Sequence, residues 1–397
     1  MLWAVILIPA LAGAAAMGLP GRSARRAMLL AGSLGHSGAV AWLCAWGTNS
    51  SGDSWIGLDA TGRLFLSVTS GLFLATAVYT VGYLRREAGH ETRDGQEGFL
   101  FRNEPEAIFL GCLLLFLATM SLVCVSQHLG LLWVAVEATT LASAPLISFH
   151  RHHRSLEATW KYLLICSVGI ALALLGNFFL AIAATQPPGQ PVVPLVLGDL
   201  LNAAPSLNVE WLKAAFLLLL VGYGTKMGLA PLHTWLPDAH SEAPSMVSAL
   251  LSGALLNCAL LAILRILQVC LKAGLEDFAQ PLMILFGLAS LVVAAVFIIR
   301  QGDFKRMLAY SSVEHMGLVA LGVGLAGAAG FGAMLHAVNH SLTKGLLFLV
   351  AGNILAAYRT KSVSDTSGVV HVLPVSGVLW LAGFLAISGS PPFGPFV

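Results

Sequence analysis

Two ionisable residues lie inside apolar segments long enough to cross a membrane. Lys226 lies within residues 211–251, followed by Pro231 and His233, and Glu137 lies within LGLLWVAVEATTLASAPL. A lysine at the centre of a membrane helix costs roughly 2.5–3.5 kcal/mol on insertion scales, so a compensating partner is expected. Glu137 lies about nine residues, or about 14 Å, into its segment. We predict that the two side chains pair, and that Pro231 keeps the pair reversible by breaking the helix. A static ion pair is the alternative.

A second group of titratable residues recurs at helical spacing. His336, His340 and Lys344 are separated by four residues each and therefore share one helix face, with successive residues about 6 Å apart. Histidine titrates near neutral pH, so a row of this kind suits proton relay or the ordering of water. Asn257, in LLSGALLNCALLAILR, is expected to make a polar contact between helices.

The composition is that of a membrane protein. Of 397 residues, 57% are hydrophobic and 10% are charged, with a mean hydropathy of +0.83, whereas soluble domains carry about 25% charged residues. No basic tract accompanies the aromatic residues, so nucleic-acid binding has no support. The six cysteines lie in apolar runs without a CxxC motif, which favours packing roles. We predict no metal and no cofactor on this chain, and place any redox centre on other chains.

Hydropathy predicts about twelve transmembrane helices, the last one interrupted. Because lipid cannot satisfy open backbone groups, the predicted fold is an all-α polytopic bundle. The first span is expected to be retained, because the basic residues follow it rather than precede it. The predicted spans are 2–19, 27–47, 63–84, 106–126, 128–148, 159–184, 211–235, 243–271, 281–299, 308–328, 331–356 and 372–390.

The loops between these spans differ sharply in basic residues, and this predicts orientation. Even-numbered loops carry only Arg63 and Lys272. The N-terminus is therefore predicted to face the periplasmic side, and the odd-numbered loops the cytoplasm. The odd-numbered loops carry fourteen basic residues: Arg22, Arg25, Arg26, Arg85, Arg86, Arg93, Arg102, Arg151, Arg154, Arg300, Lys305, Arg306, Arg359 and Lys361.

Several charged features have two readings. The mixed-charge loop 85–105 is a solvated loop or a docking surface for a partner subunit. The basic turn 150–154, with three histidines, is read as a positive-inside anchor rather than a metal site, because no carboxylate supports it. Glu314 and His315 form either the mouth of a proton path or an interface cap. Arg265 either has a functional role or reaches the outer interface.

Four motifs together resemble one known family. LAPLHTWLPDAHSEAPSMVSALLSG, VEATT, the HxxxHxxxK face and GSPPFG look like the antiporter-like membrane subunits of respiratory complex I, Mrp-type cation/proton antiporters and membrane-bound hydrogenases. The segments YSSVEHMGL and GTKMGLAPLHTWLPDAHSEAPS most resemble the hydrogenase 4 / formate hydrogenlyase branch. The resemblance covers nearly the whole chain and is densest over 128–355.

The resemblance implies two inverted five-helix repeats, each with a broken helix, and a polar axis along the membrane midplane. Glu137 would be the acid coupled to Lys226 on the first broken helix. His336, His340 and Lys344 would form the relay of the second half. Asn257 stands where many relatives have a lysine, and an asparagine cannot take up a proton at neutral pH.

The division implied is 1–105 as an N-terminal three-helix segment, 106–271 as the first repeat and 281–397 as an incomplete second repeat. Pro391 and Pro392, in GSPPFG, would break the second interrupted helix. Relatives usually continue beyond this point, so the chain is expected to be truncated at its C-terminus.

The predicted function is that of a proton-translocating membrane subunit of a multi-subunit oxidoreductase, hydrogenase-like or NADH:quinone oxidoreductase-like. Its expected partners are other membrane subunits, a soluble redox arm and membrane lipids, in the cell inner membrane. One alternative is a subunit of a Mrp-type Na⁺/H⁺ antiporter. Alternatives of other classes are a structural membrane anchor for a soluble enzyme and a solute transporter.

Overall fold

Long apolar helices make up almost all of the described chain. A computed structural model describes residues 1–397 except 48–54, 88–91, 94–99, 102, 186–192 and 397. Within these residues, nine helices are long and apolar enough to cross a membrane. They are α2 (Arg22–Trp46), α3 (Ala60–Glu87), α4 (Glu106–Val125), α5 (Leu129–Ile147), α6 (His153–Ala183), the continuous run α10–η2–α11 (Ser245–Lys272), α12 (Glu276–Ile298), α13 (Phe304–Leu325) and α14 (Gly327–Tyr358).

Two shorter apolar helices match further predicted spans. These are α1 (Ala4–Gly18) and α16 (Pro374–Ile387). The predicted span 211–235 corresponds to α8 (Val209–Met227), which a turn separates from α9 (Trp235–Glu242). The predicted all-α membrane fold is confirmed, and the total of twelve spans stays a prediction.

Short elements connect the long helices. They are the antiparallel pair β1 (Thr92–Arg93) and β2 (Leu100–Phe101), α7 (Leu197–Ala203), η1 (Ala204–Ser206), α15 (Val369–Val372) and η3 (Gly394–Phe396). Much of the charged loop 85–105 lies outside the described residues, so its proposed docking role rests on the sequence alone.

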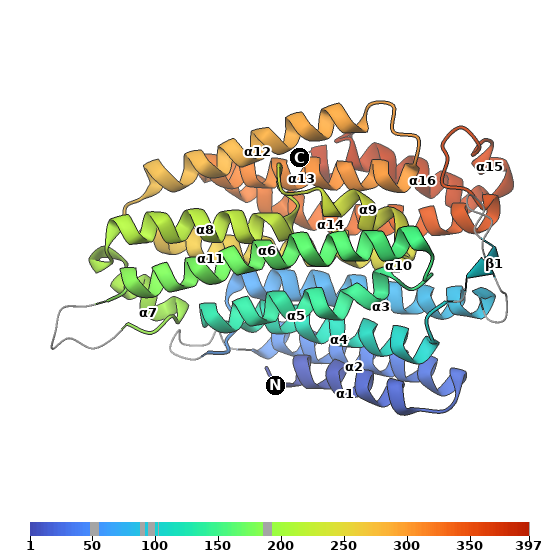
Figure 1. The fold of residues 1–397 in the computed structure, drawn as a ribbon, viewed down its shortest axis with the longest axis horizontal. Coiled ribbons are helices and arrows are strands. Elements are labelled where there is room, and N and C mark those ends of the chain that lie inside the picture. Colours follow the sequence, from blue (N-terminus) through green and yellow to red (C-terminus); the bar gives the residue numbers. More distant parts are fainter. Residues whose placement is uncertain (48–54, 88–91, 94–99, 102, 186–192, 397) are drawn as a thin grey trace.

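The helices run roughly along one direction, as Figure 1 shows. The first helices, α1 to α4, form one side of the bundle, and α12, α13 and α16 form the other. Between them lie α6, α8, α9 and α11, with α10–η2 packed against α14. The most buried helix run is α10–η2–α11, which is 94% buried over its most apolar window.

Small residues bring the pairs of helices around the charged side chains close together. Gly169 of α6 and Gly222 of α8 pack directly against each other, since a Cβ built on Gly222 would lie 2.6 Å from the carbonyl oxygen of Gly169. Gly287 of α12 and Gly317 of α13 meet in the same way, with a Cβ on Gly287 lying 2.8 Å from the Gly317 carbonyl oxygen. Such contacts are the usual device for close helix packing in membranes.

Candidate proton-transfer site

Lys226 lies in the last turn of α8, with its side chain inside the bundle. It is 1% exposed. Its Nζ atom donates hydrogen bonds to Thr140 Oγ1 at 2.8 Å and to the Tyr162 hydroxyl at 2.6 Å. The ammonium also lies 4.3 Å from the centroid of the Tyr162 ring, within the range of a cation–π contact. Hydroxyls and an aromatic ring therefore surround this buried charge.

Glu137, on α5, reaches Lys226 only through Thr140. Thr140 Oγ1 donates to Glu137 Oε2 at 3.2 Å, and Ser167 Oγ donates to Glu137 Oε1 at 3.3 Å. Within the described residues, no ion pair joins Glu137 to Lys226. The predicted direct contact between Glu137 and Lys226 is thus wrong. Thr140 follows Glu137 by three residues on the same helix face, which places its hydroxyl between the two charges. The predicted partnership itself is present in bridged form.

Helix α8 breaks a few residues before Pro231, the residue from which the break was predicted. Helix α8 ends at Met227, and Gly228 follows in the left-handed region with φ of 83°, a conformation that favours glycine. The Trp235 indole donates to the Thr225 carbonyl at 2.8 Å, and Ser290 Oγ accepts from the backbone nitrogen of Ala230 at 2.9 Å. These bonds satisfy backbone groups that the break leaves open. Pro231 lies within the resulting turn.

His233 lies in the same turn but apart from the Lys226 contacts. Its side chain is buried, at 7% exposed, and its ring lies 6.2 Å from the Tyr310 ring on α13. Among the described residues, its Nδ1 atom has no hydrogen-bond partner. The structure therefore places His233 between the broken helix and α13, without a bond to Lys226.

The second titratable group is a cluster in which helix α14 meets α13 and η2. His336 Nε2 and His315 Nδ1 are 2.9 Å apart, and the rings of His315 and His340 are 5.5 Å apart. His340 Nε2 lies 3.5 Å from Ser252 Oγ, which is 2.8 Å from Ser312 Oγ. The predicted shared face of His336 and His340 exists. His315 of α13, interpreted from the sequence as part of a path mouth or an interface cap, lies against this face.

Lys344 extends this cluster by one helical turn. Its side chain is fully buried, and Nζ donates to the Leu308 carbonyl at 2.8 Å. Asn257, which lies just after the π-helical turn η2 (Leu251–Leu255), donates through Nδ2 to Ser341 Oγ at 2.7 Å. Single π turns are frequent at functional sites. Asn257 thus makes the predicted contact between helices and lies beside the histidine cluster.

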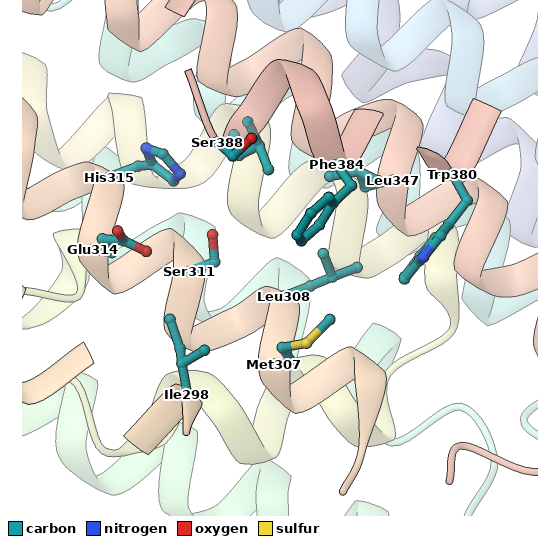
Figure 2. Close-up of a pocket in the computed structure, with 11 residues that line it drawn as sticks. Ile298, Met307, Leu308, Ser311, Glu314, His315, Leu347, Trp380, Phe384 and Ser388 are labelled. Atoms are coloured by element: carbon teal, nitrogen blue, oxygen red, sulfur yellow. The ribbon is translucent and has the colours of Figure 1, made fainter. Parts of the chain in front are cut away.

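A pocket opens beside this cluster, between α13 and α16. It has a volume of about 180 Å³. Figure 2 shows Glu314 and His315 at one end and the aromatic rings of Phe384 and Trp380 toward the other. Glu314 therefore lines a cavity that reaches the histidine cluster, which favours the path-mouth reading over the interface cap.

Pro391 and Pro392 lie in a turn that follows α16. Helix α16 ends at Ile387, and Gly389 has φ of 73°. This turn packs against α14, because a Cβ built on Gly394 would lie 2.6 Å from the side-chain amide of Asn339. The helix therefore ends just before the predicted break at the two prolines.

A charge cluster at the end of α9 was missed by sequence reasoning. Lys361 Nζ donates to Glu242 Oε1 at 2.8 Å and to Ser241 Oγ at 3.0 Å, and Ser241 Oγ donates to Asp303 Oδ2 at 2.6 Å. The buried Lys305 donates to the carbonyls of Ser241 and Ala243. We call these residues the α9 charge cluster.

His240 packs α9 against α14, the helix that carries Lys344. Its ring is fully buried and stacked on Phe348 at 4.9 Å. The charges of Lys305, in the α9 charge cluster, and of Lys344, in the second group, both act on it. Both ring nitrogens lack a hydrogen-bond partner among the described residues.

Arg265 ties three elements together at the other end of the bundle. Its guanidinium is 0% exposed, pairs with Asp59 at 2.9 Å, and donates to the carbonyls of Val123, Cys124 and Ser126. A guanidinium with this many fixed acceptors is a structural clamp. The structure thus gives Arg265 a structural role, which neither of the two alternatives drawn from the sequence had named.

A family comparison covers most of this site. Residues 126–397 match the family described as NADH:quinone oxidoreductase/Mrp antiporter, transmembrane. The chain belongs to this family. The matched region contains Glu137, Lys226, Asn257 and the whole second titratable group. The resemblance predicted from the motifs is therefore confirmed.

Proteins similar in sequence to this chain include hydrogenase components. It is 38% identical over 344 residues to the hydrogenase-4 component F homolog of Methylacidiphilum infernorum, covering 86% of this chain and 70% of that protein. It is 29% identical over 353 residues to hydrogenase-4 component B of Escherichia coli, covering 86% of this chain. The chain spans 49% of the length of that second relative.

Solved structures share the fold of this family member. A chain of the archaeal membrane-bound sulfane sulfur reductase superposes with a TM-score of 0.85 at 22% identity, covering all of this chain and 79% of the other. A chain of respiratory complex I from Thermus thermophilus superposes with a TM-score of 0.76 at 25% identity, and the match covers 100% of this chain and 80% of the other. A chain of the Mrp complex from Dietzia superposes with a TM-score of 0.80 at 21% identity, and the match covers 100% of this chain and 72% of the other.

Proposed function

We propose that this chain is a proton-translocating membrane subunit of a multi-subunit oxidoreductase, hydrogenase-like or NADH:quinone oxidoreductase-like. The observation that carries the proposal is the bridge from half-buried Glu137 through buried Thr140 to buried Lys226, which joins two ionisable groups through one hydroxyl. Support comes from the family match and from relatives named as hydrogenase components. Within such a complex, the partners are other membrane subunits, a soluble redox arm and lipid.

The proposed path has two halves that use different chemistry. In the first half, Lys226 donates a hydrogen bond to the Thr140 hydroxyl, and that hydroxyl donates one to Glu137. A change in the charge of Glu137 therefore reorganises the hydrogen bonds of Lys226. In the second half, the α9 charge cluster admits protons past His240 to Lys344 and the histidines. Buried ionisable residues inside a membrane protein mark ion pathways and proton relays.

The orientation and the two-repeat division belong to the same proposal. Lys361, which pairs with Glu242 in the α9 charge cluster, is one of the fourteen basic residues of the odd-numbered loops, which we assign to the cytoplasm. The N-terminus then lies on the periplasmic side of the cell inner membrane. Residues 1–105 form an N-terminal segment, 106–271 the first repeat and 281–397 the described part of the second.

Lys226→Ala in the intact complex tests the proposal. Reconstituted in vesicles with a pH-sensitive dye, the variant is expected to lose the proton movement that accompanies electron transfer. Its matched control is Lys213→Ala, because Lys213 lies on the same helix α8 but pairs with Glu210 at the surface. If Lys226→Ala moves as many protons per electron as the wild type, the proposal fails.

A Mrp-type Na⁺/H⁺ antiporter subunit is the second candidate, favoured by the likeness to the Mrp fold. It predicts proton movement driven by a sodium gradient in vesicles that contain no electron donor. Proton movement that requires the donor and is indifferent to sodium excludes it. A structural anchor is excluded by the same Lys226→Ala measurement, because an anchor needs no buried lysine.

A further inference from the structure

The N-terminal helices contain a buried histidine that the proposed path does not use. His36, on α2, is 0% exposed. Its Nδ1 lies 3.0 Å from Ser70 Oγ on α3, and its Nε2 lies 2.9 Å from Ser121 Oγ on α4. Both ring nitrogens therefore have a hydroxyl partner, and each partner comes from a different helix.

Further hydroxyls lie near His36 and Ser70 along α2 and α3. Ser37 Oγ lies 3.1 Å from Ser70 Oγ. The hydroxyls of Ser33 and Thr69 are buried and, within the described residues, have no hydrogen-bond partner. A buried hydroxyl without a partner costs about 1–3 kcal/mol. A group of polar atoms of this kind is where proteins hold buried water.

A line of polar residues leads from His36 to one end of the bundle. Arg63, Ser67 and Ser70 are spaced by four and three residues and share one face of α3. Ser67 Oγ lies 3.3 Å from the sulfur of Cys44 on α2. Burial decreases along this line, from buried Ser70 through half-buried Ser67 to exposed Cys44. His36 lies ten residues, or about 15 Å, from Trp46, where α2 ends.

On its other side, His36 approaches the second half of the site. Ser121, its α4 partner, is next to Met120, whose carbonyl accepts from the Cys258 thiol at 3.9 Å. Cys258 is the neighbour of Asn257, and Asn257 bonds Ser341, the neighbour of His340. Helices α4 and α11 therefore touch one residue away from Ser121 and one residue away from Asn257.

We propose that His36 is a proton-transfer residue that connects the Asn257 region with the ends of α2 and α3 at Trp46 and Ala60, on the side proposed above as periplasmic. This inference rests on the proposed function. The Ser121 hydroxyl donates to the Leu117 carbonyl, so its oxygen accepts from His36 Nε2. The neutral imidazole therefore accepts a proton at Nδ1 from Ser70 or water and releases the proton on Nε2 toward Ser121. Rotation of the ring and the hydroxyls restores the starting state, so no charge or bond is left changed.

The test compares proton movement in four variants of the complex in vesicles. The quantity is the Lys226-dependent proton movement per electron, which is the difference between the wild type and Lys226→Ala. We expect His36→Gln and Ser121→Ala each to retain less than half of it. Thr80→Val is the matched control, because the buried Thr80 hydroxyl on α3 bonds, among the described residues, only the Thr76 carbonyl of its own helix. It is expected to behave as the wild type.

Each outcome decides between the two proposals. If His36→Gln retains half or more of the Lys226-dependent proton movement, His36 is not on the path, and the proposed function stands. If Lys226→Ala itself changes nothing, the proposed function fails first. Should His36→Gln not assemble, Ser121→Ala carries the same decision, since it leaves the imidazole in place. Infrared difference spectra with isotope-labelled histidine are expected to lose one titrating imidazole band in His36→Gln, and an unchanged spectrum overturns the inference.

Discussion

Thr140 is the residue whose replacement tests the bridged arrangement most directly. Thr140→Val keeps the shape of the side chain and removes the hydroxyl that accepts from Lys226 and donates to Glu137. A hydrogen bond to a charged group contributes about 1.5–3 kcal/mol. At about 1.4 kcal/mol per factor of ten, its loss weakens the coupling of the two charges by roughly 10- to 150-fold. Tyr162 and its ring still hold the ammonium, so assembly is expected to survive.

The assay is the number of protons moved per electron by the reconstituted complex. We expect Thr140→Val to lower it severalfold and Thr140→Ser, which keeps the hydroxyl, to restore it. Thr139→Val is the control, because within the described part of the chain the neighbouring Thr139 hydroxyl bonds only the Val136 carbonyl of its own helix, at 2.6 Å. Wild-type proton movement in Thr140→Val would refute the role of the bridge. Equal losses in Thr139→Val would show that helix α5 was disturbed instead.

Two further predictions concern stability. A Cβ built on Gly169 would lie 2.7 Å from Thr225 Cβ, so Gly169→Val forces α6 away from α8 at a cost of about 1–3 kcal/mol. The purified complex is therefore expected to unfold at a lower temperature. Gly332→Ala is the control and is expected to leave the unfolding temperature unchanged, because a Cβ built on Gly332 has no atom within 4 Å. Arg265→Met leaves Asp59 without its ion-pair partner and is expected to destabilise by about 3 kcal/mol, the low end for a buried pair because the Asp59 side chain is 27% exposed. Arg265→Lys, which keeps one charge but not the fork of donors, is expected to recover only part of that loss in the same measurement, and full recovery would contradict the clamp.

The helices and their breaks were predictable because apolar length and glycine or proline act locally. The spans match α2 to α6, the run α10–η2–α11 and α12 to α14 closely, and the break near Pro231 was placed within a few residues. The miss at Gly228 has the same local cause, since a glycine with positive φ ends a helix before a following proline does. The face shared by His336 and His340 also follows from spacing alone.

The contacts between helices were not predictable, because hydropathy does not encode which helices touch or how they are rotated. Thr140 and Tyr162 carry no sequence signal, and a mid-helix threonine usually bonds its own backbone. His36 is a single histidine in an apolar segment, without the regular spacing that identified His336. Its two serine partners lie 34 and 85 residues away along the chain.

A hydroxyl between Glu137 and Lys226 suits a transfer site better than a direct pair does. The two hydrogen bonds, 2.8 Å and 3.2 Å, place the nitrogen and the carboxylate oxygen no more than about 6 Å apart. At an effective dielectric of about 20, the attraction is then about 3 kcal/mol, against about 6 kcal/mol for a contact at 2.8 Å. The weaker attraction still offsets the cost of the buried lysine, roughly 2.5–3.5 kcal/mol. Because little remains beyond that offset, a modest change in field or hydration is enough to shift the proton.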